Sequence, residues 1–328
     1  MQTPKISIVI LNWNRKQDTL ECLTSTLAIQ DPHFEVICVD NGSTDGSSAA
    51  IRAQFPSVRL IENGANLGFA EGNNVGIRDA LTRNAEFVFL LNNDTVVDPN
   101  LLQAFRTTFQ TYPKAGILGA KIYLYDERKT LDHLGGKWNA QKGIFEFIGL
   151  RSQEDGISWE TPQAIDYVCG AAFMIKRSVF EAIGSLEKDF FLFWEEADFC
   201  FRARRAGFQV LTCPKAHIWH RVSASFIGGK PHSTYFWWRG RFLFIARNCS
   251  KLEKKHLFWR VLLPEILHLY KMRWIKWTEL KLLRLFRSRK DLQEKERKQL
   301  KNSSALAGIQ DYYLGRFGSG PAWIYQKR

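Results

Sequence analysis

Three polar residues that directly follow a short apolar run could bind a metal ion. The run is Phe87–Leu91, and Asn92, Asn93 and Asp94 follow it. Such a run is typical of a strand buried on both faces, and open α/β sheets bind ligands beyond the carboxyl ends of their strands. Carboxamide and carboxylate oxygens are ligands for a hard cation such as Mg²⁺ or Mn²⁺. The alternative is a polar turn that caps a helix.

A second candidate site consists of three acidic residues behind an aromatic run. Glu195, Glu196 and Asp198 follow Phe190–Trp194. Apolar surroundings disfavour the charged form of a carboxylate and therefore make it a stronger base. The alternative is that these residues only occupy the first turn of a helix, where negative charge suits the helix dipole. For Asp198, the i,i+4 spacing to Arg202 also predicts a structural ion pair.

Two histidines form a third candidate site. His217 and His220 come after a predicted strand and after Pro214, which places them on a predicted loop. Either imidazole could supply a nitrogen ligand to a metal ion. The alternative is a pair of exposed loop histidines with no ligand.

The elements that must position these residues alternate between strand and helix in the first half of the chain. Apolar runs predict strands, and apolar residues at helical spacing predict helices. The predicted strands are 5–11, 34–39, 58–61 and 87–91, and the predicted helices between them include 18–30 and 69–84. This alternation predicts a parallel sheet with right-handed crossovers. Asn12, Asp40 and Asn92–Asp94 then meet at one edge of that sheet.

Asp40 stands where mononucleotide-binding folds often bind a base or ribose, at the end of the second strand. The alternative is an Asx-turn that closes the following loop. Neither G-x-x-x-x-G-K-[ST] nor G-x-G-x-x-G follows the first strand. A bound diphosphate would therefore need a metal ion or basic side chains.

The second half is less regular, and its charge changes near residue 235. Strands are predicted at 115–124, 165–176 and 208–212, helices at 178–183 and 194–206, and a hairpin or loop insert at 131–158. Residues 1–234 hold 24 Lys and Arg against 26 Asp and Glu, whereas residues 235–302 hold 19 against 6. We therefore predict a catalytic domain over 1–234 and a basic, aromatic-rich helical region over 235–328.

The basic region has the composition of a segment that lies on an anionic membrane. Lys281, Arg284 and Arg287 recur at i,i+3 spacing, and aromatic residues are interleaved with the charges. This pattern predicts peripheral membrane contact. The apolar runs are too short to predict a spanning helix. The alternative is a helical subdomain that packs on the catalytic domain. Without an accompanying motif, we predict no nucleic-acid partner.

The cysteines and the N-terminus predict a cytoplasmic protein. The six cysteines are scattered without a close pair, so they form neither a disulfide framework nor a zinc pattern. The N-terminus shows no basic segment and no cleavage site of a signal peptide.

Several motifs together resemble the family 2 inverting glycosyltransferases, in particular the rhamnosyltransferase-like and galactofuranosyltransferase-like subgroup. They are KISIVILNWN, VDNGSTDGS, ENGANLGFAEGNNVGI, LLNNDT, CGAAFMIKRSVFEAIG, FFLFWEEADFCFRARRAGF and AHIWHRVSAS, in the family's order and spacing over roughly residues 5–247. The resemblance implies a GT-A fold, which is an α/β fold with a mixed, mainly parallel sheet flanked by helices. Residues 1–112 would bind the nucleotide-sugar and residues 113–234 the acceptor.

The resemblance also implies roles for individual residues. Asp94 matches the metal-binding end of the D-x-D motif, and His220 matches a histidine that can join the metal. Glu196 matches the general base and Glu195 a residue that contacts the acceptor. The residues expected to bind the nucleotide-sugar are Asn12, Asp40, Asn66, Gly68, Asn92 and Asn93, and those expected to bind the acceptor are Trp194 and Asp198. Asn92 replaces the first Asp of D-x-D, which removes one negative charge near the metal.

The resemblance implies a reaction in which a metal-dependent enzyme moves a sugar from a nucleotide-diphospho-sugar to a hydroxyl group, with inversion. Rhamnose from dTDP-rhamnose is the expected donor, and the expected acceptor is a saccharide or a polyprenyl-linked saccharide of a cell-surface polysaccharide. The expected location is the inner face of the plasma membrane. The alternatives are a UDP-sugar donor, or a silent nucleotide-sugar-binding membrane scaffold.

Overall fold

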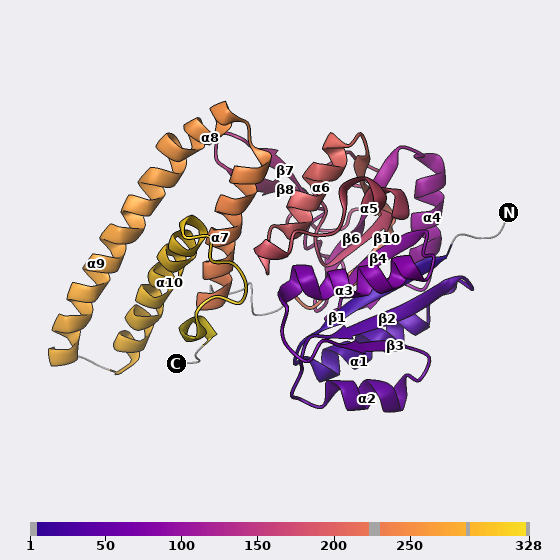
Figure 1. The fold of residues 1–328 in the computed structure, drawn as a ribbon, viewed down its shortest axis with the longest axis horizontal. Coiled ribbons are helices and arrows are strands. Elements are labelled where there is room, and N and C mark those ends of the chain that lie inside the picture. Colours follow the sequence, from indigo (N-terminus) through magenta and orange to yellow (C-terminus); the bar gives the residue numbers. More distant parts are fainter. Residues whose placement is uncertain (1–4, 223–229, 287–288, 326–328) are drawn as a thin grey trace. The chain divides into compact units, whose positions relative to one another are not determined.

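The computed structural model describes residues 5–222, 230–286 and 289–325, without the side chains of residues 276–295. The described residues form two compact units (Figure 1). The first contains residues 5–138, 145–188 and 195–222, and the second contains residues 139–144, 189–194 and the described part of 230–325. The domain boundary predicted at residue 235 falls inside helix α7 (Pro231–Asn248). The prediction followed the change in charge, which occurs a few residues after the start of that helix.

One sheet of eight strands forms the centre of the first unit. Its strands, in the order β3-β2-β1-β4-β9-β6-β10-β5, are β1 (Ile6–Asn12), β2 (Phe34–Asp40), β3 (Arg59–Glu62), β4 (Phe87–Asn92), β5 (Thr95–Val97), β6 (Ala115–Leu124), β9 (Ala172–Lys176) and β10 (Gln209–His220). Pairing is parallel between β1 and β2, β1 and β4, β2 and β3, and β6 and β10. Only β9 and β5 pair antiparallel with their neighbours. The predicted mixed, mainly parallel sheet is confirmed.

Helices cover the sheet, and they contact opposite faces because side chains alternate along a strand. Ile8 and Ile10 pack in one core with Leu23 of α1, whereas the neighbouring Val9 faces Gly76 of α3, where an added Cβ would lie 2.4 Å from Val9. The absence of a side chain at Gly76 therefore lets α3 lie directly on β1. The helices of this unit are α1 (Lys16–Leu27), α2 (Ser47–Gln54), α3 (Gly68–Thr82), α4 (Leu101–Thr111), α5 (Arg177–Ile183) and α6 (Glu195–Arg205). A 3-10 turn at Lys188–Phe190 lies where the chain passes from this unit to the second.

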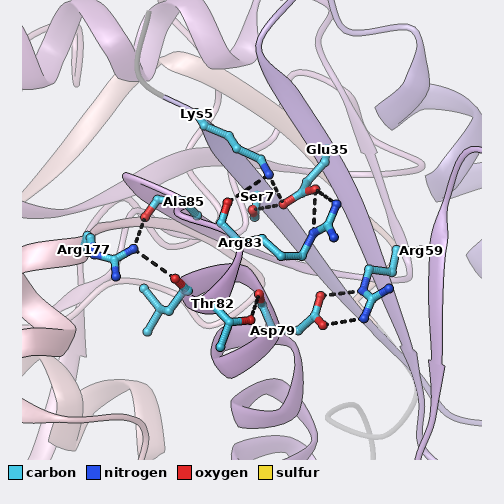
Figure 2. A network of polar contacts seen from close by, with 10 residues as sticks. Lys5, Ser7, Glu35, Arg59, Asp79, Thr82, Arg83, Ala85 and Arg177 are labelled. Carbon is cyan, nitrogen blue, oxygen red and sulfur yellow. Dashed lines mark hydrogen bonds and ion pairs between the residues drawn. The ribbon is translucent and has the colours of Figure 1, made fainter.

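A polar network joins the amino-terminal ends of the strands (Figure 2). The Glu35 carboxylate accepts hydrogen bonds from Ser7 (2.7 Å) and Arg83 (2.9 Å) and pairs with Lys5 (2.9 Å). Arg59 binds Asp79 through two nitrogens at 2.6 and 2.7 Å. These contacts connect β1, β2 and β3 to α3 at the edge opposite Asn12 and Asp40, which leaves the carboxyl edge free for a site.

The strand β10 is longer than the sequence predicts. Its pairing with β6 shifts between Cys213 and His217, and the strand continues to His220 after this irregularity. The predicted loop around His217 and His220 is therefore wrong, because a bulge accommodates Pro214 without ending the strand. The three-residue strand β5 was not predicted. The hairpin predicted within 131–158 is confirmed as β7 (Gly136–Asn139) paired with β8 (Ile144–Phe147).

The second unit is helical. Two buried arginines of α7 hold short segments of the chain in this unit. Arg239 donates to the carbonyl of Phe190 at 3.3 Å, and Arg241 donates to the carbonyl of Gly143 at 2.9 Å and pairs with Glu265 at 2.6 Å. The remaining helices are α8 (Lys251–Leu257), a π-helical turn (Phe258–Leu262), α9 (Leu263–Phe286), α10 (Arg289–Tyr313) and a 3-10 turn (Ala322–Tyr325). Among the described residues, no helix is long and apolar enough to cross a membrane.

Candidate active site

The antiparallel pairing of β5 with β10 brings Asp94 and His220 together. His220 lies opposite Thr95 in this pairing, and the backbone N–H of Arg221 donates to the carbonyl oxygen of Asp94 at 2.9 Å. As a result, Asp94 Oδ1 lies 3.1 Å from His220 Nε2 although the two residues are far apart in sequence. The predicted metal ligands are therefore neighbours in space.

The pair has the chemistry of an incomplete metal site. Asp94 Oδ1 is buried, and its partner among the described residues is the imidazole of His220 at 3.1 Å. Burial lowers the pKa of His220, but the carboxylates of Asp132 and Asp94 outweigh this effect and raise the pKa to about 9. The described residues contain no group of three or more His, Cys, Asp and Glu side chains arranged to hold a metal. Asp94 and His220 fit a divalent ion whose other ligands come from a substrate, because the anionic oxygen and the imidazole nitrogen face each other.

Asn12 links three strand ends at the carboxyl edge of the sheet. Its Nδ2 donates to Asp40 Oδ1 at 2.7 Å and to Ser43 Oγ at 3.0 Å. Its Oδ1 accepts from Thr19 Oγ1 at 2.7 Å and from Asn93 Nδ2 at 3.1 Å. Asn12 is fully buried. All four polar contacts of this carboxamide are thus to protein atoms, and Asn12 acts within the site by holding its neighbours in place.

The Asp40 carboxylate is also bonded within the protein. Besides Asn12, it accepts from the backbone N–H of Ser43 at 2.9 Å, and Asp40 is 2% exposed. This contact spans three residues and closes the loop after β2, which is the structural role that was the alternative to nucleotide binding. A direct contact between Asp40 and a base or ribose remains a prediction, and in this structure the carboxylate shapes the loop that would surround the nucleotide.

Asn41 organises the loop that contains Asn66 and Gly68. Its side chain donates to Asn66 Oδ1 and to the carbonyl of Gly68, both at 3.0 Å, and accepts from the N–H of Leu67 at 3.1 Å. Gly42 adopts a φ of +75°, and a Cβ there would lie 2.8 Å from the backbone of Ala65. The two loops therefore touch through their backbones. The sequence interpretation assigned no role to Asn41, since a buried carboxamide that bonds backbone has no distinctive spacing.

Glu195 and Glu196 begin α6 but differ in exposure. Glu195 is buried at 3% exposure, whereas Glu196 is partly exposed. Burial and the negative charge of Glu196 raise the pKa of Glu195 well above its usual range. Because Glu195 is buried and Glu196 is partly exposed, Glu196 is the carboxylate of this pair that an acceptor hydroxyl can reach as a base. The predicted acceptor contact of Glu195, whose side chain is buried, stays a prediction.

The loop before β9 contacts Asn92 at the end of β4 and also the carboxylate of Glu196. The N–H of Asn92 donates to the carbonyl of Ala171 at 2.8 Å, and a Cβ on the preceding Gly170 would lie 3.5 Å from the Glu196 carboxylate. Removal from water, together with the negative charges of Asp132, Glu196 and Asp94, raises the pKa of the Cys169 thiol. The negative charges of Glu196, the predicted base, and of Asp94, the predicted metal ligand, therefore both raise the pKa of Cys169.

Two residues predicted to bind the acceptor have structural partners instead. Asp198 is fully buried and pairs with Arg202 at 2.8 Å, which is the alternative that its spacing also predicted. Trp194 is 7% exposed, and its Nε1 donates to the carbonyl of Trp237 at 3.1 Å within the second unit. The contact of these two side chains with an acceptor stays a prediction.

The match to a protein family comes from residues 7–184, which fit the family model for Glycosyl transferase family 2 and make up more than half of the chain. This chain belongs to glycosyl transferase family 2. The recognised motifs and the site described above fall largely within this match, and Glu196 and His220 lie beyond its end.

Named relatives of this family 2 chain act on sugars. It is 29% identical over 209 residues to Low-salt glycan biosynthesis hexosyltransferase Agl10 of Haloferax volcanii, covering 63% of this chain and 64% of the relative. That match thus spans slightly less than two thirds of the relative's length. It is 27% identical over 268 residues to N-acetylglucosaminyl-diphospho-decaprenol L-rhamnosyltransferase of Mycobacterium tuberculosis, covering 72% of this chain and 86% of the relative.

A solved structure supports the fold. The mannosyltransferase PcManGT from Pyrobaculum calidifontis, in complex with GDP-Man and Mn²⁺, superposes with a TM-score of 0.56 at 15% identity and covers 96% of this chain and 88% of that chain. The family 2 chain therefore has the predicted GT-A fold.

The exchange of Asn12 for alanine tests the polar cluster at the strand ends. Asn12→Ala leaves the buried Asp40 carboxylate with one hydrogen bond fewer and removes the acceptor of Thr19 and Asn93. We expect the free energy of unfolding to fall by about 1–3 kcal/mol, measured by urea unfolding. Asn100→Ala is the control, because Asn100 is exposed and its side chain caps no helix. Equal stability of the two variants would contradict the role given to Asn12.

Proposed function

We propose that this protein is an inverting, metal-dependent glycosyltransferase that moves a sugar from a nucleotide-diphospho-sugar to a hydroxyl group of a saccharide or lipid-linked acceptor. The observation that carries the proposal is the contact of Asp94 Oδ1 with His220 Nε2 at 3.1 Å. The partly exposed Glu196 lies against Gly170, and the next residue, Ala171, accepts a hydrogen bond from Asn92. Family membership supports transfer of a sugar.

Two groups of residues act on opposite sides of the anomeric carbon of the transferred sugar. Asp94 and His220 would hold Mg²⁺ or Mn²⁺, which would neutralise charge on the departing nucleoside diphosphate. Glu196 takes the proton from the acceptor hydroxyl as its oxygen attacks the anomeric carbon. The acceptor oxygen bonds to that carbon while the bond to the diphosphate oxygen breaks on the opposite side. A single displacement of this kind inverts the configuration.

The proposed donor is dTDP-rhamnose, and the proposed product belongs to a cell-surface polysaccharide. The support is the name of the mycobacterial relative, an L-rhamnosyltransferase that acts on a diphospho-decaprenol-linked sugar. A UDP-sugar is the alternative donor. A silent nucleotide-sugar-binding scaffold is the alternative function, and the partly exposed Glu196 argues against it, because a scaffold needs no base.

Replacement of Glu196 by Gln tests the base. The variant keeps the size of the side chain but cannot accept the acceptor proton, so we expect turnover to fall about 10²–10⁴-fold while donor binding stays the same. Product formation and the affinity for dTDP-rhamnose are measured separately. Glu181→Gln is the matched control, since Glu181 is exposed on α5 and pairs only with Arg177 in the described contacts. Full activity of Glu196→Gln would assign the base to another residue.

Replacement of Asp94 by Ala tests the metal pair. We expect the variant to lose the metal-dependent part of nucleotide binding, because it lacks the anionic ligand. Thermal unfolding with dTDP is measured in Mg²⁺, in Mn²⁺ and in EDTA; saturation at 100 times Kd would add about 2.7 kcal/mol to the wild-type stability. Asp98→Ala serves as control, because Asp98 bonds the N–H of Asn100 instead of facing His220. The same nucleotide-induced shift in all three conditions for the wild type would exclude the metal.

The proposal includes peripheral attachment to an anionic membrane through α9 and the π-helical turn before it. Leu267, Tyr270 and Trp274 lie at i, i+3 and i+7 spacing and are 59%, 56% and 66% exposed. Exposed cations accompany these apolar side chains, namely Arg260, Lys271 and Arg273. Aromatic and basic side chains together favour the interface of a membrane with anionic lipids. Lys281, Arg284 and Arg287, on which the sequence prediction rested, lie outside the described side chains.

Vesicle binding tests this attachment. We expect the protein to sediment with phosphatidylglycerol-rich vesicles at low salt, to be released at high salt, and not to sediment with phosphatidylcholine vesicles. Trp274→Ser combined with Tyr270→Ser should weaken the binding. The control is Trp13→Ser, because Trp13 is 45% exposed but lies in the first unit. Binding that is equal on both lipids, or unaffected by the paired substitution, would contradict the assignment.

A further inference from the structure

The imidazole of His220 lies between two carboxylates, one at each ring nitrogen. Nε2 lies 3.1 Å from Asp94 Oδ1, and Nδ1 lies 3.5 Å from Asp132 Oδ2. The side chains of His220 and Asp132 are 12% and 10% exposed, so solvent competes little for these contacts. Asp132 was not singled out in the sequence, because it lies in an irregular segment with no spacing that relates it to His220.

Backbone and side-chain contacts hold Asp132 in this position. Its N–H donates to the carbonyl of Ile122 in β6 at 2.8 Å, and β6 pairs with the strand that carries His220. Its second carboxylate oxygen lies 3.5 Å from Arg151 Nη2. The neighbouring His133 is directed elsewhere, because its Nδ1 accepts from the N–H of Gly135 at 3.0 Å and its ring packs against Phe147. Asp132 is therefore the carboxylate that the fold presents to Nδ1 of His220.

A histidine binds a metal through one nitrogen only when that nitrogen is unprotonated, and the partner of the other nitrogen decides the tautomer. Carboxylates that accept this second N–H orient the ring and increase its basicity, and their loss typically weakens metal binding 10–100-fold. We propose that Asp132 is a positioning residue that fixes the orientation of the His220 ring from the Nδ1 side, so that Nε2 and Asp94 together could hold a divalent ion. The inference rests on the proposed function, in which Asp94 and His220 hold the metal. It adds Asp132 as the residue that prepares His220 for this role.

The affinity for Mn²⁺ tests the inference without any measurement of turnover. Free Mn²⁺ is titrated by electron paramagnetic resonance in the presence of dTDP. We expect Asp132→Asn to bind Mn²⁺ 10–100-fold more weakly, because a carboxamide can donate to Nδ1 and permit the wrong tautomer. Asp132→Glu should restore part of the affinity. Asp126→Asn is the matched control, since it removes the same charge from an exposed position of the same segment.

A second measurement on the wild-type protein covers the case in which Asp132→Asn does not fold. Nitrogen NMR shifts of the His220 ring, assigned by comparison with His220→Gln and recorded with Mg²⁺ and dTDP, should show a proton on Nδ1 and a metal-shifted Nε2. Metal-induced change at Nδ1 instead would overturn the inference.

The outcomes separate this inference from the proposed function. If Asp94→Ala and His220→Gln weaken Mn²⁺ binding but Asp132→Asn binds like the wild type, the positioning role is wrong and the metal pair stands. If neither Asp94→Ala nor His220→Gln changes the affinity, the metal pair itself is wrong, and the role of Asp132 falls with it.

Discussion

The candidate site depends on one short piece of backbone pairing, between β5 and β10. Three residue pairs, from Val97 with Ile218 to Thr95 with His220, run antiparallel at the edge of the sheet. A β-strand fixes the side of the sheet to which each side chain points, so this register decides that His220 faces Asp94. A shift by one residue would turn His220 to the opposite face. The metal chemistry proposed for this protein is thus a consequence of strand register.

The remaining polar groups at this edge are largely bonded to one another. Asn12 binds Asp40, Thr19 and Asn93, and Asn41 binds the loop of Asn66 and Gly68. Buried polar groups must be paired, and a fully paired network holds its members in one arrangement. Asp94 Oδ1 differs from these groups, since it is buried and its partner is the imidazole of His220. A rigid, paired network with a carboxylate and an imidazole at its border suits a site that is completed by a ligand.

The sequence predicted the parts of this arrangement that depend on local patterns. Apolar runs such as Phe87–Leu91 indicate buried strands, and strand–helix alternation places Asn12, Asp40 and Asp94 at one edge. Long-range pairing was beyond such patterns. β5 is too short to show a period, and a proline after Cys213 suggests the end of a strand although β10 continues through a bulge. The contact between Asp132 and His220 and the burial of Trp194 depend on tertiary packing, which no spacing encodes.

The central claim is that Asp94 and His220 hold a divalent ion next to the bound nucleotide, with Glu196 beside them as the base. A crystal structure of the full chain with dTDP and Mn²⁺, analysed for the anomalous signal of manganese, tests it most directly. We expect one strong peak within coordination distance of Asp94 and His220 Nε2 and of the diphosphate oxygens. A manganese peak on Glu195 and Glu196, or a bound diphosphate without manganese at Asp94, would contradict it.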